Sequence, residues 1–337
     1  MSLRFAAVGF AHNHIFNQVD MLLREGAELV WYWDRVPDRL PEFVSRYPQA
    51  RLARTLDEIL DDGTVQLIVS ADVPAERAPL GIRAMLHGKD FSTAKPGFIS
   101  LAQLDEVRRV HTLTGRRYFV HFGERIESAV TVRAGELARA GAIGRVVQTT
   151  GFGPHRLLGH IPRAAWTYDA EQHGGILNDL ASHQIDQFLF FTGSQSAEIA
   201  SAHVGNVKFA QFPRFQDYGD LTIRSPNAVG FVRVDWLTPE GLATWGDVRL
   251  FLLGTEGYIE LRKNIDLAGR PGKDHLFLVD ARGTHYIDCA NVATPYGAQL
   301  VADIRDRTET AIGQAHTFIA CELALKAQAM AVQLGGQ

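Results

Sequence analysis

The sequence predicts an α/β protein of two domains: an N-terminal doubly wound parallel sheet, and a C-terminal α+β domain with a large, mostly antiparallel open sheet. In the first third of the chain, short apolar runs alternate with segments of helical periodicity, as in right-handed β-α-β crossovers. Beyond Gly123, strand signals broken by Gly, Pro and Asn dominate. The 337 residues suffice for two domains, which we expect over 1–122 and 123–337.

The N-terminal elements alternate between strand and helix. The apolar stretch from Leu3 to Gly9 predicts a buried strand, and apolar residues then recur at helical spacing until Gly26 ends the run. A further helix is expected over 100–114. The later strands are expected at 28–33, 65–71, 90–94 and 117–122. Such a series implies a parallel sheet that is covered on both faces.

The C-terminal elements combine helices with a long series of strand signals. A strand is expected at 146–151, and the clearest later signals are 229–236 and 249–262, the last with a glycine-containing turn that suits a hairpin. The residues of 229–236 alternate between an apolar side and a mixed side, which suits a partner subunit or solvent. The expected helices are 126–140, 175–191, 297–310 and 314–333.

Composition favours small-molecule chemistry. The net charge of -4 and the pI near 6.4 provide no basic surface for a nucleic acid or an anionic membrane. No apolar run approaches the ~18 residues of a membrane span, and the apolar start at Leu3 is too short for a signal peptide. Because Cys289 and Cys321 are the only cysteines, we expect no disulfide framework, and a cytoplasmic location.

The stretch "AVGFAHNH" (7–14) follows the first strand and opens a helix, where a dinucleotide-binding turn would lie. Gly9 supplies the tight turn, whereas Ala11 and His14 stand where the second and third glycines of the G-x-G-x-x-G pattern usually do. The pattern alone leaves a plain strand-turn-helix open. The residues expected to contact the cofactor phosphates are Gly9, Phe10, Ala11, His12, Asn13 and His14.

Asp34 ends the second predicted strand, 25 residues after Gly9. An acidic side chain there can accept hydrogen bonds from the adenosine ribose and would repel a 2′-phosphate, which favours NAD over NADP. Arg35 beside it can pair with a phosphate or stack on adenine. A solvated helix start is the alternative for both residues. Ala71 and Asp72, which follow the strand at 65–71, are also expected at the cofactor.

Lys95 follows the predicted strand 90–94 and precedes Pro96 and Gly97. It therefore lies at the carboxyl edge of the parallel sheet, where such folds bind ligands. The alternative is a solvated surface charge. We expect Lys95 to be catalytic, and Lys95 and Pro96 to contact the cofactor.

The segment "HGGILNDLASHQIDQF" (173–188) carries a second group of polar residues. Asp179 and His183 are four residues apart on a predicted helix, so they share one face, which Asp186 continues. A structural Asp-His pair is the alternative. A metal site made of Glu171, His173, Asp179 and His183, or of His12 and His14, lacks a standard zinc spacing, and we expect no metal.

Further polar residues are expected to bind the substrate. The loop 153–166 offers polar groups and an aromatic platform for a polyol or sugar acid, and its arginines suit a carboxylate or phosphate. For each of them a structural role is the alternative. The candidates are His121, Arg125, His155, Arg156, His160, Arg163, Trp166 and Asn178.

The order and spacing of these motifs resemble the Gfo/Idh/MocA family of nicotinamide-dependent oxidoreductases. The resemblance rests on "VGFAHNH", Asp34, "AKPG" (94–97), "GAIGRVV" (141–147) and "HGGILNDLASH" (173–183), and it runs over nearly the whole chain. It implies a Rossmann domain, a second domain whose open sheet forms dimers or tetramers, and a catalytic set carried onto Lys95, Asp179 and His183. The incomplete glycine pattern and Ala94, where a glutamate is common, depart from it.

The expected function is hydride transfer between NAD(P), with NAD favoured, and a carbinol carbon of a sugar, cyclitol or related hydroxy compound. His183 would be the general base, Lys95 would stabilise the developing alkoxide, and Asp179 would orient the sugar or the imidazole. Two alternatives remain: an NAD-retaining glycoside hydrolase or epimerase, and a non-catalytic sensor of dinucleotides or sugars. A homodimer or homotetramer through the C-terminal sheet is expected.

Overall fold

The computed structural model describes residues 2–157 and 163–334. The chain forms two compact units, one of residues Met1–His121 and Pro295–Phe318, the other of Phe122–Thr294 and Ile319–Gln337. The division at 122/123 expected from the sequence did not include this return of the chain to the first unit. No helix of the described residues is long and apolar enough to cross a membrane.

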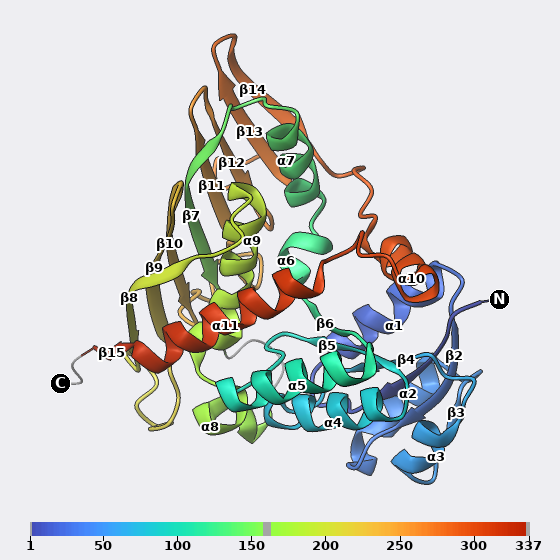
Figure 1. Ribbon diagram of the computed structural model, residues 1–337. Helices are drawn as coiled ribbons and strands as arrows, with labels where there is room; N and C mark the ends of the chain where they lie inside the picture. The colour runs from blue at the N-terminus through green and yellow to red at the C-terminus, as the bar shows by residue number, and fades with distance from the viewer. Residues whose placement is uncertain (1, 158–162, 335–337) are drawn as a thin grey trace. The chain divides into compact units, whose positions relative to one another are not determined.

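The first unit contains a six-stranded parallel sheet of order β3-β2-β1-β4-β5-β6 (Figure 1). Its order reverses between β1 and β4, the place where doubly wound sheets bind ligands. Strands β4 and β5 are fully buried and lie within the strands expected at 65–71 and 90–94. The strands are β1 (Arg4–Val8), β2 (Glu28–Trp33), β3 (Arg51–Leu52), β4 (Leu67–Ser70), β5 (Asp90–Ala94) and β6 (Tyr118–His121).

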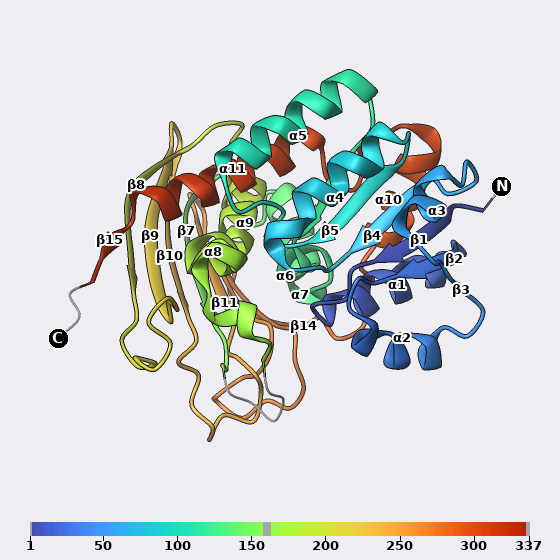
Figure 2. The ribbon, with the colours of Figure 1, turned by 90° about the horizontal axis from the view of Figure 1, so that it is seen from below.

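Helices cover both faces of this sheet, as the parallel arrangement requires. Helices α4 and α5 lie side by side on one face, and α1 lies on the other (Figure 2). A short 3₁₀ helix (Pro37–Arg39) precedes α2. The helices are α1 (His14–Arg24), α2 (Leu40–Arg46), α3 (Leu56–Asp61), α4 (Pro74–Leu86), α5 (Leu101–Thr114) and α10 (Tyr296–Asp306).

The returning segment is fixed to the first unit by close packing and by hydrogen bonds. Helix α10 packs on α1 so closely that a Cβ at Gly297 would lie 2.9 Å from Met21 Cγ. The side-chain amide of Gln314 makes two hydrogen bonds to the backbone of Tyr118. Its oxygen accepts from the N–H of Tyr118 and its nitrogen donates to the carbonyl of Tyr118, each over 2.9 Å. The amide thereby covers part of the open edge of β6. The helix expected over 297–310 ends earlier, at Asp306.

The second unit contains a nine-stranded sheet of order β14-β13-β12-β11-β7-β10-β9-β8-β15. Only the β7–β10 and β8–β15 pairs are parallel, so the expectation of a mostly antiparallel sheet is confirmed. The strands are β7 (Val146–Pro154), β8 (Glu198–Gly205), β9 (Tyr218–Ser225), β10 (Ala228–Asp235), β11 (Arg249–Gly254), β12 (Tyr258–Arg262), β13 (His275–Asp280), β14 (Gly283–Asp288) and β15 (Val332–Gln333).

One face of this sheet is covered by helices, and glycines allow their close approach (Figure 1). A Cβ at Gly151 would lie 2.6 Å from Gln184 Cγ, and one at Gly230 would lie 2.8 Å from Phe188 Cδ2. The helices of this unit are α6 (Gly123–Ile126), α7 (Ala129–Arg139), α8 (Ala170–His173), α9 (Ser182–Thr192) and most of α11 (Gln314–Met330).

Several expected elements of the second unit differ from the sequence prediction. The helix 126–140 is interrupted, because Ser128 caps a new helix by accepting from the N–H of Thr131. The strand 146–151 extends to Pro154, paired with β10 along its length. The last helix stops at Met330, and Val332–Gln333 instead pair with β8, so the expected helix 314–333 is three residues too long.

Candidate active site

The turn after β1 is tied to the neighbouring strands by backbone hydrogen bonds. Gly9 donates to the carbonyl of Trp33 at the end of β2, and its carbonyl accepts from the N–H of Ala71 after β4, both at 3.0 Å. Its φ is +80°, and an added Cβ would lie 2.6 Å from the Cβ of Asp72. Only glycine fits this position without moving the backbone.

Two backbone donors of this turn are left for a ligand. Within the described part of the chain, the N–H groups of Ala11 and Asn13 have no protein acceptor. Asn13 is the N-cap residue of α1 and Ala11 lies two residues before it, and the helix dipole favours an anion at this end. Such donors at a helix N-terminus are what a phosphate needs. The residues present therefore fit the diphosphate of a dinucleotide.

His12 and His14 contact each other in this turn. The N–H of His14 donates to Nδ1 of His12 (3.1 Å), and their ring centroids are 4.0 Å apart. Since a backbone N–H can only donate, Nδ1 of His12 is the unprotonated nitrogen here. His12 thus helps to cap α1, whose N-cap residue Asn13 makes no capping bond. No three His, Cys, Asp or Glu residues form a metal-binding group in the described ranges.

The carboxylate of Asp34 is directed at the backbone. One oxygen accepts from the N–H of Phe10, the other from the N–H of Val36 (2.6 Å), and the side chain is fully buried. Phe10 itself stacks on Phe43, with 4.2 Å between the ring centroids. Asp34 therefore fastens the glycine turn to the end of β2. The motif indicated a residue exposed to the ribose and gave no sign of this role.

Two arginines lie among carboxylates beyond Asp34. Arg35 is 3.0 Å from Glu76 and 3.5 Å from Asp72. Arg39 is 3.7 Å from Asp34 and 3.9 Å from Asp72. Burial raises the pKa of Asp72, and Arg35 opposes this. Both guanidinium groups thus already have anionic partners.

Lys95 is buried at the carboxyl end of β5, followed by Pro96. The neighbouring strand β6 ends at His121, which is paired with Ala94 in the sheet register. The His121 ring packs edge-on against Tyr296, with 5.5 Å between centroids. The sheet therefore brings Lys95 and His121 to one edge.

Asp179 and His183 lie in the second unit on a helix that begins irregularly. Residues Leu177–Ala181 form a π-helical turn that leads directly into α9. His183 and Asn178 are buried and Asp179 is half-buried. The Phe122 ring meets the His183 ring edge-on at 6.4 Å. The prediction of a regular helix over 175–191 is thus wrong at its start. A π-helical turn within a helix is frequent at functional sites.

Two glutamines from distant segments bind the start of this helix. Gln216 accepts from the N–H of Ile176 (2.9 Å), and Gln328 accepts from the N–H of Leu177 (3.0 Å). The two amides also bond to each other at 3.1 Å. A Cβ at Gly175, whose φ is +83°, would lie 2.2 Å from Gln328. The glycine pair of the motif is required for this contact.

An aromatic group in the second unit surrounds two of the expected substrate residues. His155 lies 5.2 Å from Trp236 and 4.6 Å from Trp245 between ring centroids, and Arg163 lies over Trp236 at 4.5 Å. Burial lowers the pKa of Arg163, and the nearby charge of Asp179 opposes this. Arg163 is therefore close enough to Asp179 for their charges to interact.

The other expected substrate residues have different surroundings. Arg156 donates to the carbonyls of Pro239 and Thr244, and so supports the loop that carries Trp245. Arg125 makes a bidentate pair with Asp186 (2.6 and 2.9 Å). Both have structural partners. Trp166 is half-buried in a 3₁₀ helix (Ala165–Tyr168), and His160 lies outside the described residues.

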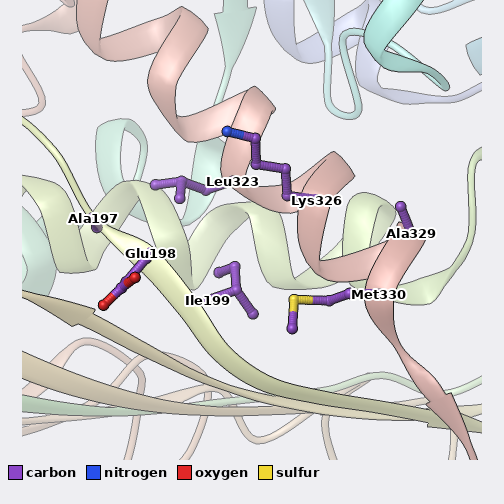
Figure 3. A pocket seen from close by; sticks show the side chains of 7 residues that line it. All are labelled: Ala197, Glu198, Ile199, Leu323, Lys326, Ala329 and Met330. Atoms are coloured by element: carbon purple, nitrogen blue, oxygen red, sulfur yellow. The ribbon is translucent and has the colours of Figure 1, made fainter.

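A cavity of about 400 Å³ opens between β8 and α11 in the second unit (Figure 3). Its wall is mostly apolar, with the charged groups of Glu198 and Lys326 beside it. None of the expected site residues contributes to it. The lining residues are Ala197, Glu198, Ile199, Leu323, Lys326, Ala329 and Met330.

Sequence reasoning missed Phe122, Trp236 and Trp245 as neighbours of the expected residues. Trp236 closes a predicted strand, which is the one signal that marked it. Trp245 is half exposed in an irregular loop and has no periodic pattern around it. Their roles depend on contacts between distant segments, which spacing alone does not predict.

Comparison with known proteins identifies the family. Residues 131–260 match the model of the GFO/IDH/MocA C-terminal domain. The crystal structure of a proposed oxidoreductase from Erwinia carotovora atroseptica is 41% identical, covers 99% of this chain and 100% of its own, and has a TM-score of 0.96. The chain belongs to the Gfo/Idh/MocA family of oxidoreductases. The resemblance seen in the sequence motifs is confirmed.

Other Gfo/Idh/MocA-like proteins are more distant. D-xylose dehydrogenase from Paenarthrobacter nicotinovorans is 29% identical over 150 residues, which are 43% of this chain and 38% of that protein. An oxidoreductase from Agrobacterium radiobacter, in complex with NAD⁺, L-tartaric acid and magnesium, shares the fold with a TM-score of 0.80 at 18% identity, over 98% of this chain and 97% of that chain.

Proposed function

We propose that this protein is an NAD(P)-dependent dehydrogenase that oxidises a CH–OH group of a sugar, cyclitol or related hydroxy compound, or reduces the matching carbonyl. The observation that carries the proposal is the presence of Lys95, Asp179 and His183 in a chain of the Gfo/Idh/MocA family. The names of relatives support it, since one is a D-xylose dehydrogenase.

The three residues have complementary tasks in this reaction. When bound, the nicotinamide supplies the acceptor or donor of a hydride. His183 takes the hydroxyl proton, as a neutral imidazole can. Lys95 donates a hydrogen bond to the same oxygen and stabilises its developing negative charge. Asp179 orients a neighbouring hydroxyl or the imidazole.

The group around Trp236 favours a hydroxylated ring as substrate. Aromatic faces pack against the C–H groups of sugars, and adjacent polar groups bind hydroxyls. Arg163, held over Trp236 and near Asp179, provides a fixed positive charge for an anionic substituent. We therefore place a sugar or sugar acid among the substrates to be tried first.

Purified protein incubated with NAD⁺ or NADP⁺ and a panel of sugars, cyclitols and sugar acids tests this function. We expect reduced nicotinamide to accumulate with at least one polyol. Product formed with no net reduction would instead indicate an epimerase or a glycoside hydrolase. Binding of the dinucleotide with no product from any compound would support a sensor.

We propose NAD as the preferred cofactor, on the charges around Arg35 and Arg39. Both guanidinium groups have carboxylate partners, so a 2′-phosphate would compete with Glu76 and Asp72. The neighbouring carboxylate of Asp34 would also repel the 2′-phosphate of NADP.

Replacing Glu76 with glutamine is expected to shift the preference toward NADP⁺. The change releases Arg35 from an exposed ion pair, and such pairs contribute up to about 1 kcal/mol, or about fivefold in affinity. Calorimetric titration with both dinucleotides measures the ratio of the two Kd values. The double variant Glu76→Gln/Arg35→Gln should lose the gain, and an unchanged ratio in Glu76→Gln would reject the assignment.

We propose that the uncovered face of the nine-stranded sheet forms a homo-oligomer. On this face, Thr150 of β7 lies between Phe231 of β10 and Phe251 of β11. Leu253 of β11 is paired with Tyr258 of β12 on the same face. Phe231 is 38% exposed, and Leu253 and Tyr258 are each 46% exposed. Exposed apolar side chains that alternate with polar ones over one sheet face in this way suit a subunit interface.

Replacing Leu253 with lysine is expected to dissociate the oligomer into single chains of 37.3 kDa. A charge on an apolar interface must be buried without a partner, which strongly opposes association. Sedimentation velocity reports the mass. Leu113→Lys, at a 66% exposed leucine of the first unit, is the control and should leave the mass unchanged. A monomeric native chain would refute the proposal.

We propose a cytoplasmic location from the state of the two cysteines. Cys289 and Cys321 are both buried, and no disulfide joins them. Burial raises the pKa of Cys289 to about 12, which keeps its thiol protonated and unreactive. Reduced cysteines of this kind fit the reducing environment of the cytoplasm.

A further inference from the structure

Arg77 is a fully buried arginine in the first turn of α4, with 1% of its surface exposed. Its Nε donates to the carbonyl of Asp72 (2.7 Å). One terminal nitrogen donates to the carbonyls of Ala94 (3.0 Å), Lys95 (2.6 Å) and Pro96 (2.9 Å). We call these four groups the carbonyl cluster. A single guanidinium thus joins the segments that follow β4 and β5.

The position of Arg77 is unfavourable for its charge. A buried cation loses its hydration, and a positive charge in the first turn of a helix opposes the helix dipole. An apolar side chain would fill the same space without these costs. What the guanidinium adds is a rigid planar set of donors that fixes several acceptors at once.

The carbonyl cluster lies between two parts of the candidate site in the first unit, the turn at Gly9 and the segment around Lys95. The N–H of Ala71 binds the carbonyl of Gly9, and the Cβ of Asp72 fills the space that a side chain at Gly9 would need. On the other side, the next carbonyl, that of Gly97, accepts from the Tyr118 hydroxyl at 2.7 Å. The chain on both sides of Lys95 is therefore held by buried side chains.

We propose that Arg77 is a positioning residue that sets Lys95 relative to the dinucleotide-binding turn, by holding the segments 71–72 and 94–96 on one guanidinium. The role of Lys95 rests on the proposed function, whereas the hydrogen-bonded arrangement does not. Loss of the fork would let the two segments move independently. A misplacement of about 1 Å at a reacting group can cost about 100-fold in rate.

The test compares Arg77→Lys and Arg77→Gln with Arg83→Met, a control on the same helix. Arg83 is half exposed and pairs with Asp57 at the surface, so its replacement should change neither the hydrogen exchange of the two segments nor kcat. Arg77→Lys keeps the charge but not the fork. If charge alone matters, this variant will behave like the native protein, and the proposal is overturned.

Hydrogen exchange followed by mass spectrometry gives a readout independent of activity. For Arg77→Lys and Arg77→Gln, we expect faster exchange confined to the segments 67–73 and 90–99. Unchanged exchange, or an increase spread evenly over β1, β2 and the helices of the first unit, would show a purely structural role and reject the proposal.

Steady-state kinetics give the second readout. Both Arg77 variants should lose about 10- to 100-fold in kcat, with KM for the polyol changed less than about threefold, because the lysine is displaced in the reacting complex. Native kcat would contradict the proposal. If the native protein itself lacks turnover with every polyol, the proposed function fails, and the exchange experiment alone decides whether Arg77 holds the two segments.

Discussion

Replacing His183 with alanine is expected to lower kcat by about 10²- to 10⁴-fold, the usual contribution of a general base. Binding of the dinucleotide should be unchanged, because the proposed cofactor residues, which lie between Gly9 and Pro96, belong to the other unit.

His203→Ala is the matched control for this experiment. His203 belongs to the same unit and pairs with Asp220 at 2.9 Å, but it lies on β8 and is partly exposed. Its loss should leave kcat within about twofold, as expected for a surface position. A His183→Ala variant with native kcat, or one that loses dinucleotide binding along with turnover, would contradict the role assigned to His183.

Replacing Lys263 with methionine is expected to lower the free energy of unfolding by about 3–5 kcal/mol. The change leaves the buried carboxylate of Glu124 without its positive partner. Lys263 Nζ donates to the carbonyl of Glu124 (2.8 Å) and to Gln187 (3.0 Å), and lies 3.3 Å from the Glu124 carboxylate. Burial lowers the pKa of Lys263, and Glu124 opposes this.

The double variant Glu124→Gln/Lys263→Met should recover most of this loss, since neither charge remains buried. Urea denaturation followed by circular dichroism measures the change as a shift of the midpoint. Lys273→Met is the control, because that lysine is 75% exposed beside Asp274 and should change stability by less than about 0.5 kcal/mol. A double variant as unstable as Lys263→Met would show that lost packing, rather than the unpaired charge, is the cause.

The Glu124 carboxylate also reaches the helix that carries His183. It accepts from Gln184 at 2.7 Å, and Gln187 donates to the carbonyl of His183 at 2.9 Å. The stability of this buried group and the placement of the proposed base are therefore linked. We expect Lys263→Met to lose activity as well as stability.

The central strands of the first unit were predictable because they are buried on both faces, whereas the short exposed strand β3 at the edge was not predicted. Such buried strands are nearly continuous apolar runs, as in "LIVS" of β4, and the segments between them have helical periodicity. The return of α10 to this unit was not predictable. Its periodicity marks a helix, but only the contact of Gly297 with α1 reveals which unit it joins.

In the candidate site, too, the sequence predicts which residues matter better than it predicts what surrounds them. Motif order predicts Lys95, Asp179 and His183 as the catalytic residues, and this stays a prediction. It gave no sign that the Asp34 carboxylate accepts hydrogen bonds from the N–H groups of Phe10 and Val36. The expected contact of Asp34 with the ribose stays a prediction. Arg77 was not identified at all, because its partners are carbonyls, which leave no trace in the sequence.

Calorimetric titration of the purified protein with NAD⁺ and NADP⁺ tests the central claim most directly. The amides of Ala11 and Asn13 and the glycine turn predict saturable binding of about one dinucleotide per chain, with NAD⁺ bound more tightly. Absence of binding by both dinucleotides would contradict the assignment of this turn and, with it, the proposed dehydrogenase activity.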